Sequence, residues 1–379
     1  MTSTDSTRIA GARQAATGFS IDGRLVACSP WGPGHIHDSF KSRFETPDGD
    51  RFFLHQRLNR DVFRQPKVLM ETVQRVSAHQ QNRQAERHPG DWRRRTLQLV
   101  PSVEGPPFHI DPAGDWWRTF VFIDDTTVLS RLTRQPRQAF SLGACFGEFL
   151  ADLEPLAIET FPETIPGFHN LHSRLEQLER EVSLDRFARL SSAGACVEEL
   201  MDLRHIEDRL TQERRQTPVR LTHNDAKLEN LLFDSRSGEG LCVTDIDTVM
   251  PGLALFDFGD LIRTTALDRR EDDVGGSRSA DVDWQGVEQV VEGFVSGCPS
   301  LSNPELAGLS LGPLVMSYET AIRFLTDYLE GDVYFRTGDP EHNLRRARAQ
   351  IETLKVLMKI EGEIEGLIQS VRRDPGLAG

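Results

Sequence analysis

The chain has 379 residues, a length that suits two or three domains of ordinary size. Its 44 Lys and Arg residues against 58 Asp and Glu residues give a net charge of −14, which argues against nucleic acid or an anionic membrane as the main partner. No apolar run reaches the roughly 18 residues of a membrane span. The polar N-terminus and five scattered cysteines, none in a CxxC pair, predict a cytoplasmic protein without disulfides or a zinc site.

The first part of the chain is predicted to be rich in strands. We expect residues 1–17 to be disordered, because they are small and polar. Strands are predicted in three stretches: residues 25–58, 97–103 and 116–123. The sequence Pro-Asp-Gly-Asp at 47–50 predicts a hairpin turn within the first of them. Pro66 is expected at the start of an amphipathic helix, since the apolar residues after it recur at helical spacing.

After Asp124 the character of the sequence changes, and most of the remainder is predicted to be helical. Helices are predicted at residues 140–153, 197–210, 256–266, 282–295, 313–329 and 344–372. Short strands at 219–221 and 241–244 interrupt them, and residues 268–281 are expected to form a loop. The sequence therefore predicts an α+β protein, with a β-rich lobe at 1–124 and a helical lobe at 125–379. A cleft between two such lobes commonly binds a cofactor.

The clearest chemical signal lies in residues 221–233. His223, Asp225 and Asn230 follow the H-x-D-x-x-x-x-N spacing of a kinase catalytic loop. Such a loop aims one carboxylate at a substrate hydroxyl group and, about one turn later, an amide oxygen at a magnesium ion. We expect Asp225 to accept the hydroxyl proton, Asn230 to bind the metal and His223 to support the loop. An isolated His-x-Asp is more often a hydrogen-bonded turn, but the full pattern favours the catalytic interpretation.

Phosphoryl transfer requires a second acidic residue that binds metal between the phosphates. Asp257 begins a literal Asp-Phe-Gly but opens a predicted helix, whereas Asp245 ends a predicted strand. We favour Asp245 as the metal ligand, because the end of a strand holds a carboxylate rigidly. Asp247 is expected either to support this site or to act as an auxiliary ligand. Asp257 is expected to cap its helix and brace the catalytic loop.

The elements that would contact ATP are less distinctive. Gly32 and Gly34 form a G-x-G turn whose backbone N–H groups suit phosphate, although simple hairpins contain the same turn and no Walker A sequence is present. No lysine occupies the usual phosphate-binding place, where Arg57 is the nearest cation and Glu71 its expected partner. Exposed surface positions are the alternative for both. Lys227 is a further candidate for offsetting phosphate charge.

These motifs resemble those of the aminoglycoside phosphotransferase and choline kinase superfamily, and within it most closely those of the N-acetylhexosamine 1-kinases. The resemblance rests on Gly34–Phe40, His55–Asn59 with Val62 and Phe63, Val243–Gly252 with Asp257–Arg263, and Glu319 with Arg323–Phe335. It implies a protein-kinase-like bilobal fold. It also supports Asp245 as the metal ligand, because family members carry a strand that ends in Ile-Asp.

The resemblance further implies an activity in carbohydrate metabolism, the ATP- and Mg²⁺-dependent phosphorylation of the anomeric hydroxyl group of N-acetylglucosamine or N-acetylgalactosamine. Arg323 and Tyr334 would correspond to residues that hold the sugar, and His35 or His37 to an imidazole that covers it. A surface ion pair and a packed aromatic ring are the simpler alternatives for Arg323 and Tyr334. One position departs from the family, because Thr264 replaces an aromatic residue of the sugar site.

Two other functions stay open from the sequence. One is an aminoglycoside or other small-alcohol phosphotransferase of the same fold, for which Glu229 and the acidic loop 268–273 could bind a cationic substrate. The other is a nucleotide-binding pseudokinase, against which the intact set of Asp225, Asn230 and Asp245 argues. The sequence predicts a small-molecule sugar substrate and no nucleic-acid or membrane partner, and it leaves the oligomeric state open.

Overall fold

The computed structural model describes residues 3–32, 36–133, 135, 137–267 and 281–373. The chain divides into two compact units. The first comprises residues 1–126 together with 242–249, and the second comprises 127–241 together with 250–379. The boundary falls two residues after the predicted one at Asp124. The segment 242–249 belongs to the first unit although it lies far along the chain, and this was not predicted.

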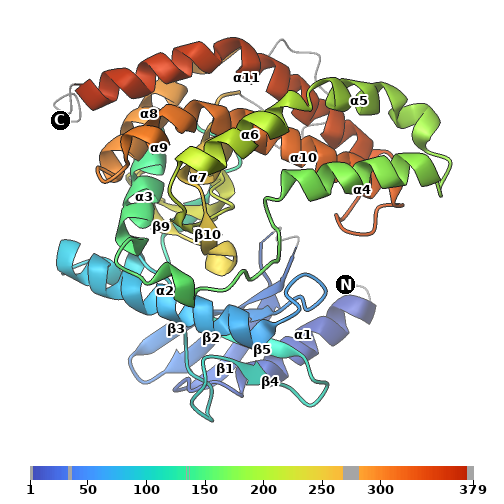
Figure 1. Ribbon diagram of the computed structural model, residues 1–379. Helices are drawn as coiled ribbons and strands as arrows, with labels where there is room; N and C mark the ends of the chain where they lie inside the picture. The colour runs from blue at the N-terminus through green and yellow to red at the C-terminus, as the bar shows by residue number, and fades with distance from the viewer. Residues whose placement is uncertain (1–2, 33–35, 134, 136, 268–280, 374–379) are drawn as a thin grey trace. The chain divides into compact units, whose positions relative to one another are not determined.

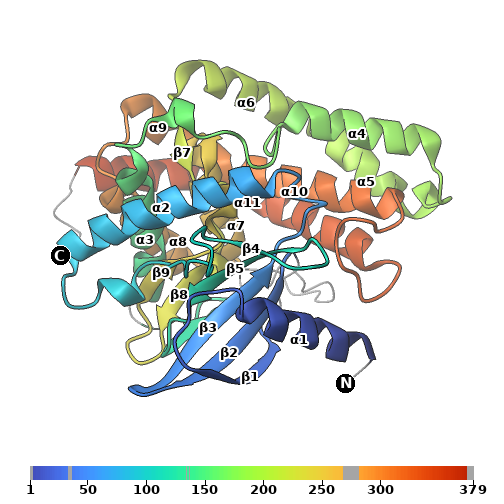
Figure 2. The ribbon, with the colours of Figure 1, turned by 90° about the horizontal axis from the view of Figure 1, so that it is seen from below.

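The first unit contains a five-stranded antiparallel sheet of order β1-β2-β3-β5-β4 (Figures 1 and 2). Its strands are β1 (Arg24–Pro30), β2 (Asp38–Thr46), β3 (Gly49–Arg57), β4 (His109–Ile110) and β5 (Trp116–Val121). The turn between β2 and β3 is the predicted hairpin, in which Gly49 has a φ of +116° that favours glycine. The predicted strand at 97–103 is wrong, because only single bridges join Leu99 to Phe120 and Ser102 to Phe19.

The N-terminal residues form a helix, α1 (Ser3–Ala16), so the prediction of disorder is wrong there. Three alanines of α1 pack into the core of the sheet. The buried residues of this core are Ala12, Ala15, Ala16, Phe19, Phe40, Phe44, Phe53, Val100 and Trp117. Arg8 of α1 also forms an ion pair with Asp38 of β2. Pattern analysis missed this helix because alanine supplies a packing face without large apolar side chains.

The second helix of the first unit, α2 (Pro66–Arg87), begins at the predicted proline and buries Leu69, Met70, Val73 and Val76. It packs against the short 3₁₀ helix η4 (Ile246–Thr248), which lies in the late segment 242–249. A second 3₁₀ helix, η1 (Trp92–Arg94), follows α2. The packing of α2 thus fixes the segment that follows Asp245.

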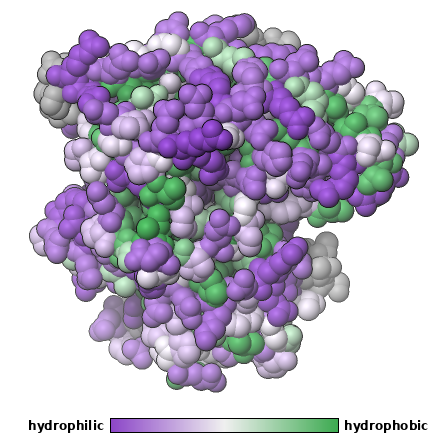
Figure 3. Space-filling view, in the orientation of Figure 1, coloured by the Kyte–Doolittle hydropathy of each residue, from purple (hydrophilic) through white to green (hydrophobic). Residues whose placement is uncertain are grey.

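The second unit is mostly helical (Figure 1). Its helices are α3 (Gln138–Leu153), α4 (Leu171–Leu184), α5 (Leu190–Asp202), α6 (His205–Gln216), α7 (Ala254–Thr265), α8 (Trp284–Gly297), α9 (Asn303–Gly308), α10 (Gly312–Leu329) and α11 (His342–Arg373). The predicted helix at 197–210 is in fact split between α5 and α6, and α4 was not predicted. The predicted loop 268–281 lies outside the described residues except for its last one. Within the described chain, no helix is long and apolar enough to cross a membrane, and the visible face is predominantly hydrophilic (Figure 3).

Short strands hold the two ends of the predicted catalytic loop. β7 (Arg220–Thr222) pairs with β10 (Met250–Gly252), and β8 (Leu231–Asp234) belongs to a sheet of order β6-β8-β9 with β6 (Thr126–Val128) and β9 (Gly240–Val243). The loop between β7 and β8 ends in a 3₁₀ helix, η3 (Leu228–Asn230). Both ends of the loop are therefore anchored in strands.

Two helices that carry polar residues near this loop are packed unusually close together. Gly259 of α7 lies against Gly312 of α10, and a Cβ atom at either position would collide with the backbone of the other helix. Nearly every residue of α10 is buried. This close approach brings Asp257 and Asp260 of α7 and Glu319 of α10 into one region of the second unit.

Candidate active site

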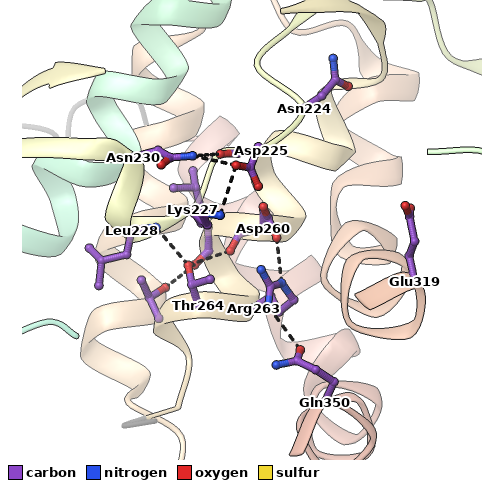
Figure 4. Close-up of polar contacts among 12 residues, drawn as sticks. Asn224, Asp225, Lys227, Leu228, Asn230, Asp260, Arg263, Thr264, Glu319 and Gln350 are labelled. Atoms are coloured by element: carbon purple, nitrogen blue, oxygen red, sulfur yellow. Dashed lines mark hydrogen bonds and ion pairs between the residues drawn. The ribbon is translucent and has the colours of Figure 1, made fainter. Parts of the chain in front are cut away.

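Asp225 lies on the loop between β7 and β8, and its neighbours fix its carboxylate. The side-chain nitrogen of Asn230 donates to Asp225 Oδ2 at 2.9 Å and to the Asp225 carbonyl oxygen at 2.8 Å. Lys227 Nζ lies 3.2 Å from Asp225 Oδ2 (Figure 4). The Asp225 side chain keeps 27% of its surface exposed. The loop therefore presents an oriented and accessible carboxylate, as a proton acceptor requires.

Asn230 and Asp245 have the donor chemistry that a magnesium site needs. The side-chain nitrogen of Asn230 donates a hydrogen bond to Asp225. The side-chain oxygen of Asn230 is therefore the atom that could bind a metal ion. Asp245 is exposed and directly follows strand β9 and Thr244, with a left-handed φ of +56°. No cluster of three or more His, Cys, Asp or Glu side chains occurs among the described residues.

His223 is fully buried and supports the loop from inside. Its ring packs edge-on against Phe146 and Phe149, with centroid distances of 5.4 and 5.7 Å. Its Nδ1 accepts a hydrogen bond from the backbone N–H of Asp225 at 3.3 Å. His223 thus contacts the backbone of the loop. This contact fits the expectation that His223 supports the loop.

Asp257 also braces the loop. Its two carboxylate oxygens accept hydrogen bonds from the backbone N–H groups of His223, at 2.9 Å, and Asn224, at 2.7 Å. Burial raises the pKa of Asp257 to about 6, although the nearby His223 and these two hydrogen bonds act in the opposite direction. The predicted bracing is present, but the predicted helix cap is not, because α7 begins at Ala254 without a side-chain cap.

The threonine that departs from the family pattern connects α7 to the catalytic loop. Thr264 Oγ1 donates to the carbonyl oxygen of Asp260 at 2.8 Å and accepts from the backbone N–H of Leu228 at 3.4 Å (Figure 4). Beside it, Arg263 Nε donates to Asp260 Oδ1 at 2.7 Å, and both side chains are buried. Burial raises the pKa of Asp260, against the opposing effect of Arg263. Thr264 therefore connects helix α7 to the predicted catalytic loop through hydrogen bonds.

In the first unit, Asp247 is enclosed by two partners. Arg118 holds both carboxylate oxygens, at 2.5 and 2.9 Å, and His37 Nε2 lies 2.7 Å from Asp247 Oδ2. Burial alone would raise the pKa of Asp247, but Arg118 and His37 outweigh it and hold the pKa far below its ordinary range. Of the two predicted roles, support of the Asp245 segment fits this geometry better than metal binding. Sequence reasoning missed the buried Arg118, although its place in an apolar strand was a signal.

The nitrogens of His37 are both engaged inside the protein. Nδ1 accepts from the backbone N–H of Asn59 at 3.0 Å, so Nε2 carries the proton and donates to Asp247. The ring also stacks on Phe63, with centroids 5.3 Å apart. Both ring nitrogens of His37, one of the two histidines predicted to cover the sugar, are thus engaged by groups of the protein. His35 and Gly34 lie outside the described residues, and Gly32 has a left-handed φ of +75°.

Arg57 does not pair with Glu71, so that prediction is wrong. Its guanidinium group contacts Asp38 at 2.5 Å and Asp115 at 3.0 Å. Glu71, which is also a described residue, does not contact it. Arg57 follows the buried Phe53 and His55 in the alternation of β3, which places it on the face that α1 covers. Two carboxylates compensate its charge, which weakens the case for a phosphate contact.

Lys41 is a cation on the opposite face of the sheet that sequence reasoning missed. It alternates with the buried Phe40 on β2. Its Nζ lies 3.5 Å from the ring centroid of Phe122, 4.8 Å from that of Trp31 and 3.8 Å from Asp124 Oδ1. Lys41 therefore shares its face of the sheet with Arg118, since Leu54 and Phe120 connect their strands in register.

Arg323 and Tyr334, the predicted sugar ligands, lie close to each other. The Arg323 guanidinium carbon is 5.8 Å from the ring centroid of Tyr334 and 5.5 Å from those of Phe168 and Phe335. The loop that carries Tyr334 is held by Asp327, whose carboxylate accepts backbone N–H groups. These donors are Val333 at 2.9 Å, Tyr334 at 2.7 Å and Phe335 at 3.0 Å. Tyr334 is 44% exposed and so remains accessible to a ligand.

A buried histidine links this region to the catalytic loop. His169 Nδ1 lies 2.9 Å from Glu319 Oε2, one turn before Arg323 on α10. Its Nε2 lies 2.8 Å from the carbonyl oxygen of Asn224, the residue before Asp225. The second unit therefore brings Asp225, the predicted proton acceptor, and the predicted sugar ligands into one connected region.

Comparison with known proteins gives this arrangement a context. Residues 107–289 match the phosphotransferase enzyme family. The fold is similar to that of a choline kinase from Cryptosporidium parvum, with a TM-score of 0.54, 13% identity and coverage of 93% of this chain and 96% of that one. Residues 107–289 are therefore similar to the phosphotransferase enzyme family, and the chain shares the fold of the choline kinase over most of its length.

Two further solved structures share the fold of this chain. An ethanolamine kinase from Plasmodium vivax has a TM-score of 0.54 and 10% identity, over 88% of this chain and 84% of that one. A spectinomycin phosphotransferase solved with ADP and spectinomycin has a TM-score of 0.51 and 12% identity, over 94% and 98%. The predicted protein-kinase-like α+β fold is thus confirmed. Asp225, Asn230 and Asp245 lie within the matched family region, whereas Arg323 and Tyr334 lie beyond it.

Proposed function

We propose that this phosphotransferase is an ATP- and Mg²⁺-dependent kinase that transfers the γ-phosphoryl group to the anomeric hydroxyl group of an N-acetylhexosamine. The observation that carries the proposal is the joint position of Arg323 and Tyr334 in the region that His169 connects to the catalytic loop. The resemblance of residues 243–263 and 319–335 to the N-acetylhexosamine 1-kinases supports the same substrate class.

The chemistry assigned to Asp225 follows from its contacts. The sugar oxygen attacks the γ-phosphorus of ATP, the bond from that phosphorus to the bridging oxygen of ADP breaks, and the hydroxyl proton passes to Asp225. Asn230 keeps the carboxylate in one orientation, and Lys227 offsets negative charge beside it. Asn230 and Asp245 would hold Mg²⁺, which neutralises phosphate charge when bound. The products are a sugar 1-phosphate and ADP.

The charges of the described site favour a neutral substrate over a cationic aminoglycoside. Burial, followed by the charge of the neighbouring Arg323, lowers the pKa of Arg174, so two guanidinium groups lie close together in this region. The nearby acids are engaged by donors of the protein itself: Glu319 by His169 and Asp327 by three backbone N–H groups. Recognition of a cationic antibiotic requires acidic groups available to the ligand. The acidic loop 268–273 lies outside the described residues.

A substrate panel tests this proposal. The protein is incubated with Mg-ATP and, separately, with N-acetylglucosamine, N-acetylgalactosamine, glucose, galactose, an aminoglycoside and choline, and the release of ADP is followed. ³¹P NMR of the product locates the phosphate. We expect turnover with N-acetylhexosamines and an anomeric phosphate. Phosphorylation of the aminoglycoside alone would reject the sugar assignment, and nucleotide binding without any turnover would indicate a pseudokinase.

The role of Asp225 is tested with Asp225→Asn, which keeps the shape of the side chain and removes the proton acceptor. We expect kcat to fall by about a thousandfold or more, while the thermal midpoint stays close to that of the wild type. Undiminished kcat in the folded variant would reject the mechanism. Because Lys227 contacts the same carboxylate, Lys227→Met serves as a comparison with a smaller expected loss.

A further inference from the structure

His169 lies on the segment before α4 and is buried, with 7% of its surface exposed. Its ring lies between two aromatic side chains, with centroid distances of 4.6 Å to Phe168 and 4.5 Å to Phe256. The guanidinium group of Arg214 donates to the His169 carbonyl oxygen at 2.9 Å. The ring is thus held in one plane, and its two nitrogens point to fixed partners.

Both partners of the His169 ring accept hydrogen bonds. Nε2 faces the carbonyl oxygen of Asn224, which can only accept, and Nδ1 faces the carboxylate of Glu319, which can only accept when ionised. Each nitrogen must therefore carry a proton, and the ring is an imidazolium cation. Burial lowers the pKa of His169, but the charge of Glu319 and the two hydrogen bonds outweigh it and raise the pKa above its ordinary value.

The charge of Glu319 is stabilised from several sides. Burial raises the pKa of Glu319, and His169, Arg323 and Arg174 outweigh it and lower the pKa below its ordinary value. Glu319 Oε2 contacts His169, while Oε1 is buried and accepts no hydrogen bond among the described residues. The charged groups that act on this ion pair are Arg174 of α4, Arg214 of α6, Asp257 and Asp260 of α7 and Arg323 of α10.

The ion pair acts on the residue directly before the proton acceptor. Asn224 has a left-handed φ of +62°, and its backbone N–H is held by Asp257 at 2.7 Å. The carbonyl oxygen of the same residue is held by His169 at 2.8 Å. Because that carbonyl belongs to the peptide group that leads into Asp225, its direction sets the direction from which the Asp225 side chain leaves the backbone.

We propose that His169 and Glu319 are positioning residues, whose ion pair fixes the Asn224–Asp225 peptide group and thereby aims the carboxylate of Asp225. Glu319 lies one turn before Arg323, so the pair also connects the orientation of the proton acceptor to the helix that carries a proposed sugar ligand. The inference rests on the proposed function, because it assigns a task to Asp225 in phosphoryl transfer.

Kinetics of two Glu319 variants test the proposal. Glu319→Ala removes the partner of Nδ1, and we expect kcat to fall by at least tenfold while KM for Mg-ATP changes by less than twofold. Glu319→Gln keeps a hydrogen-bonding group beside Nδ1, and we expect it to recover at least a third of the wild-type kcat at pH 8. The matched control is His172→Ala, which breaks the exposed His172–Glu207 pair of 2.9 Å and should leave kcat unchanged. Wild-type kcat in Glu319→Ala, or equal losses in the two Glu319 variants, would overturn the proposal.

The protonation of His169 provides a readout that needs no substrate. In ¹⁵N NMR spectra of the imidazole groups at pH 8, we expect both ring nitrogens of His169 to be protonated. A neutral His169 at pH 8 would overturn the ion pair. If the wild type phosphorylates no acceptor but His169 is an imidazolium, the proposed function fails and the ion pair stands. This measurement also decides the question if Glu319→Ala does not fold.

Discussion

Arg118 and Asp247 form a bidentate ion pair with N–O distances of 2.5 and 2.9 Å, and each side chain is only 2% exposed. The pair joins strand β5 to a segment 129 residues further along the chain. His37 contacts the same carboxylate. The pair therefore holds the segment that begins two residues after the proposed metal ligand Asp245.

Breaking one half of this pair should destabilise the protein more than removing both halves. Arg118→Met or Asp247→Leu leaves one buried charge without its partner, and we expect each to lower the free energy of unfolding by about 3–5 kcal/mol. The double variant should lose less than either single variant, because it leaves neither charge buried without its partner. Urea unfolding of all four proteins measures the coupling. The exposed Arg24–Glu45 pair is the control, since Arg24→Met should change stability by about 1 kcal/mol or less. Additive losses would contradict the assignment.

The raised pKa of Asp257 predicts a pH-dependent contribution to stability. The unfolded chain releases this proton near pH 4, whereas the folded protein keeps it until about pH 6. The free energy of unfolding should therefore fall as pH rises through this window, by about 2 kcal/mol between pH 4.5 and 7.5. Asp257→Asn cannot titrate, so the stability difference between wild type and variant should shift by that amount. The same difference at both pH values would show that Asp257 has an ordinary pKa.

Arg57 and Lys41 are alternative candidates for the cation that binds the phosphates of the nucleotide. Their environments predict which of the two makes this contact. Arg57 is compensated by Asp38 and Asp115, so Arg57→Ala should change KM for Mg-ATP by less than about twofold. Lys41 shares its face of the sheet with Arg118, and Lys41→Met should raise this KM by about tenfold, or 1.4 kcal/mol of binding. Steady-state kinetics with varied Mg-ATP decides between them. A larger effect at Arg57 would restore the assignment made from the sequence.

Asp327 should control sugar affinity without contacting the sugar. Its carboxylate holds the backbone N–H groups of the loop that carries Tyr334. Asp327→Asn offers fewer acceptors to this loop, and we expect KM for the hexosamine to rise by about tenfold while KM for Mg-ATP stays within twofold. The control is Asp339→Asn, which removes the exposed Asp339–Arg345 pair further along the same connection between α10 and α11. Equal changes in both KM values would indicate a general loss of structure.

The sequence contained enough local information to predict that Asp225 and Asn230 lie on one short loop. The spacing of Asp225 and Asn230 is short, and the structure shows that the two side chains contact each other directly. The start of α2 at Pro66 and the hairpin turn at Gly49 were also predictable, because proline and glycine act through the local backbone. Each of these features depends on a few consecutive residues.

Features that depend on distant residues were not predictable in this way. Arg57 pairs with Asp38 and Asp115 because of the register of three strands, and no local pattern encodes that register. The enclosure of Asp247 by Arg118 likewise requires the tertiary fold. α1 was missed because its packing face consists of alanines, whose contribution depends on what they pack against. Sequence patterns thus predicted the chemistry of single segments better than they predicted which distant residues those segments contact.

The membership of Cys242–Val249 in the first unit has a consequence for how the protein is made. On the ribosome, the chain emerges from its N-terminus, so the sheet and α1 leave the exit tunnel long before Asp247 does. During that interval the guanidinium group of Arg118 lacks its carboxylate partner, and η4 cannot pack on α2. The nascent sheet therefore cannot reach its final structure until most of the helical unit has been synthesised. Folding of the two units is therefore interleaved in time.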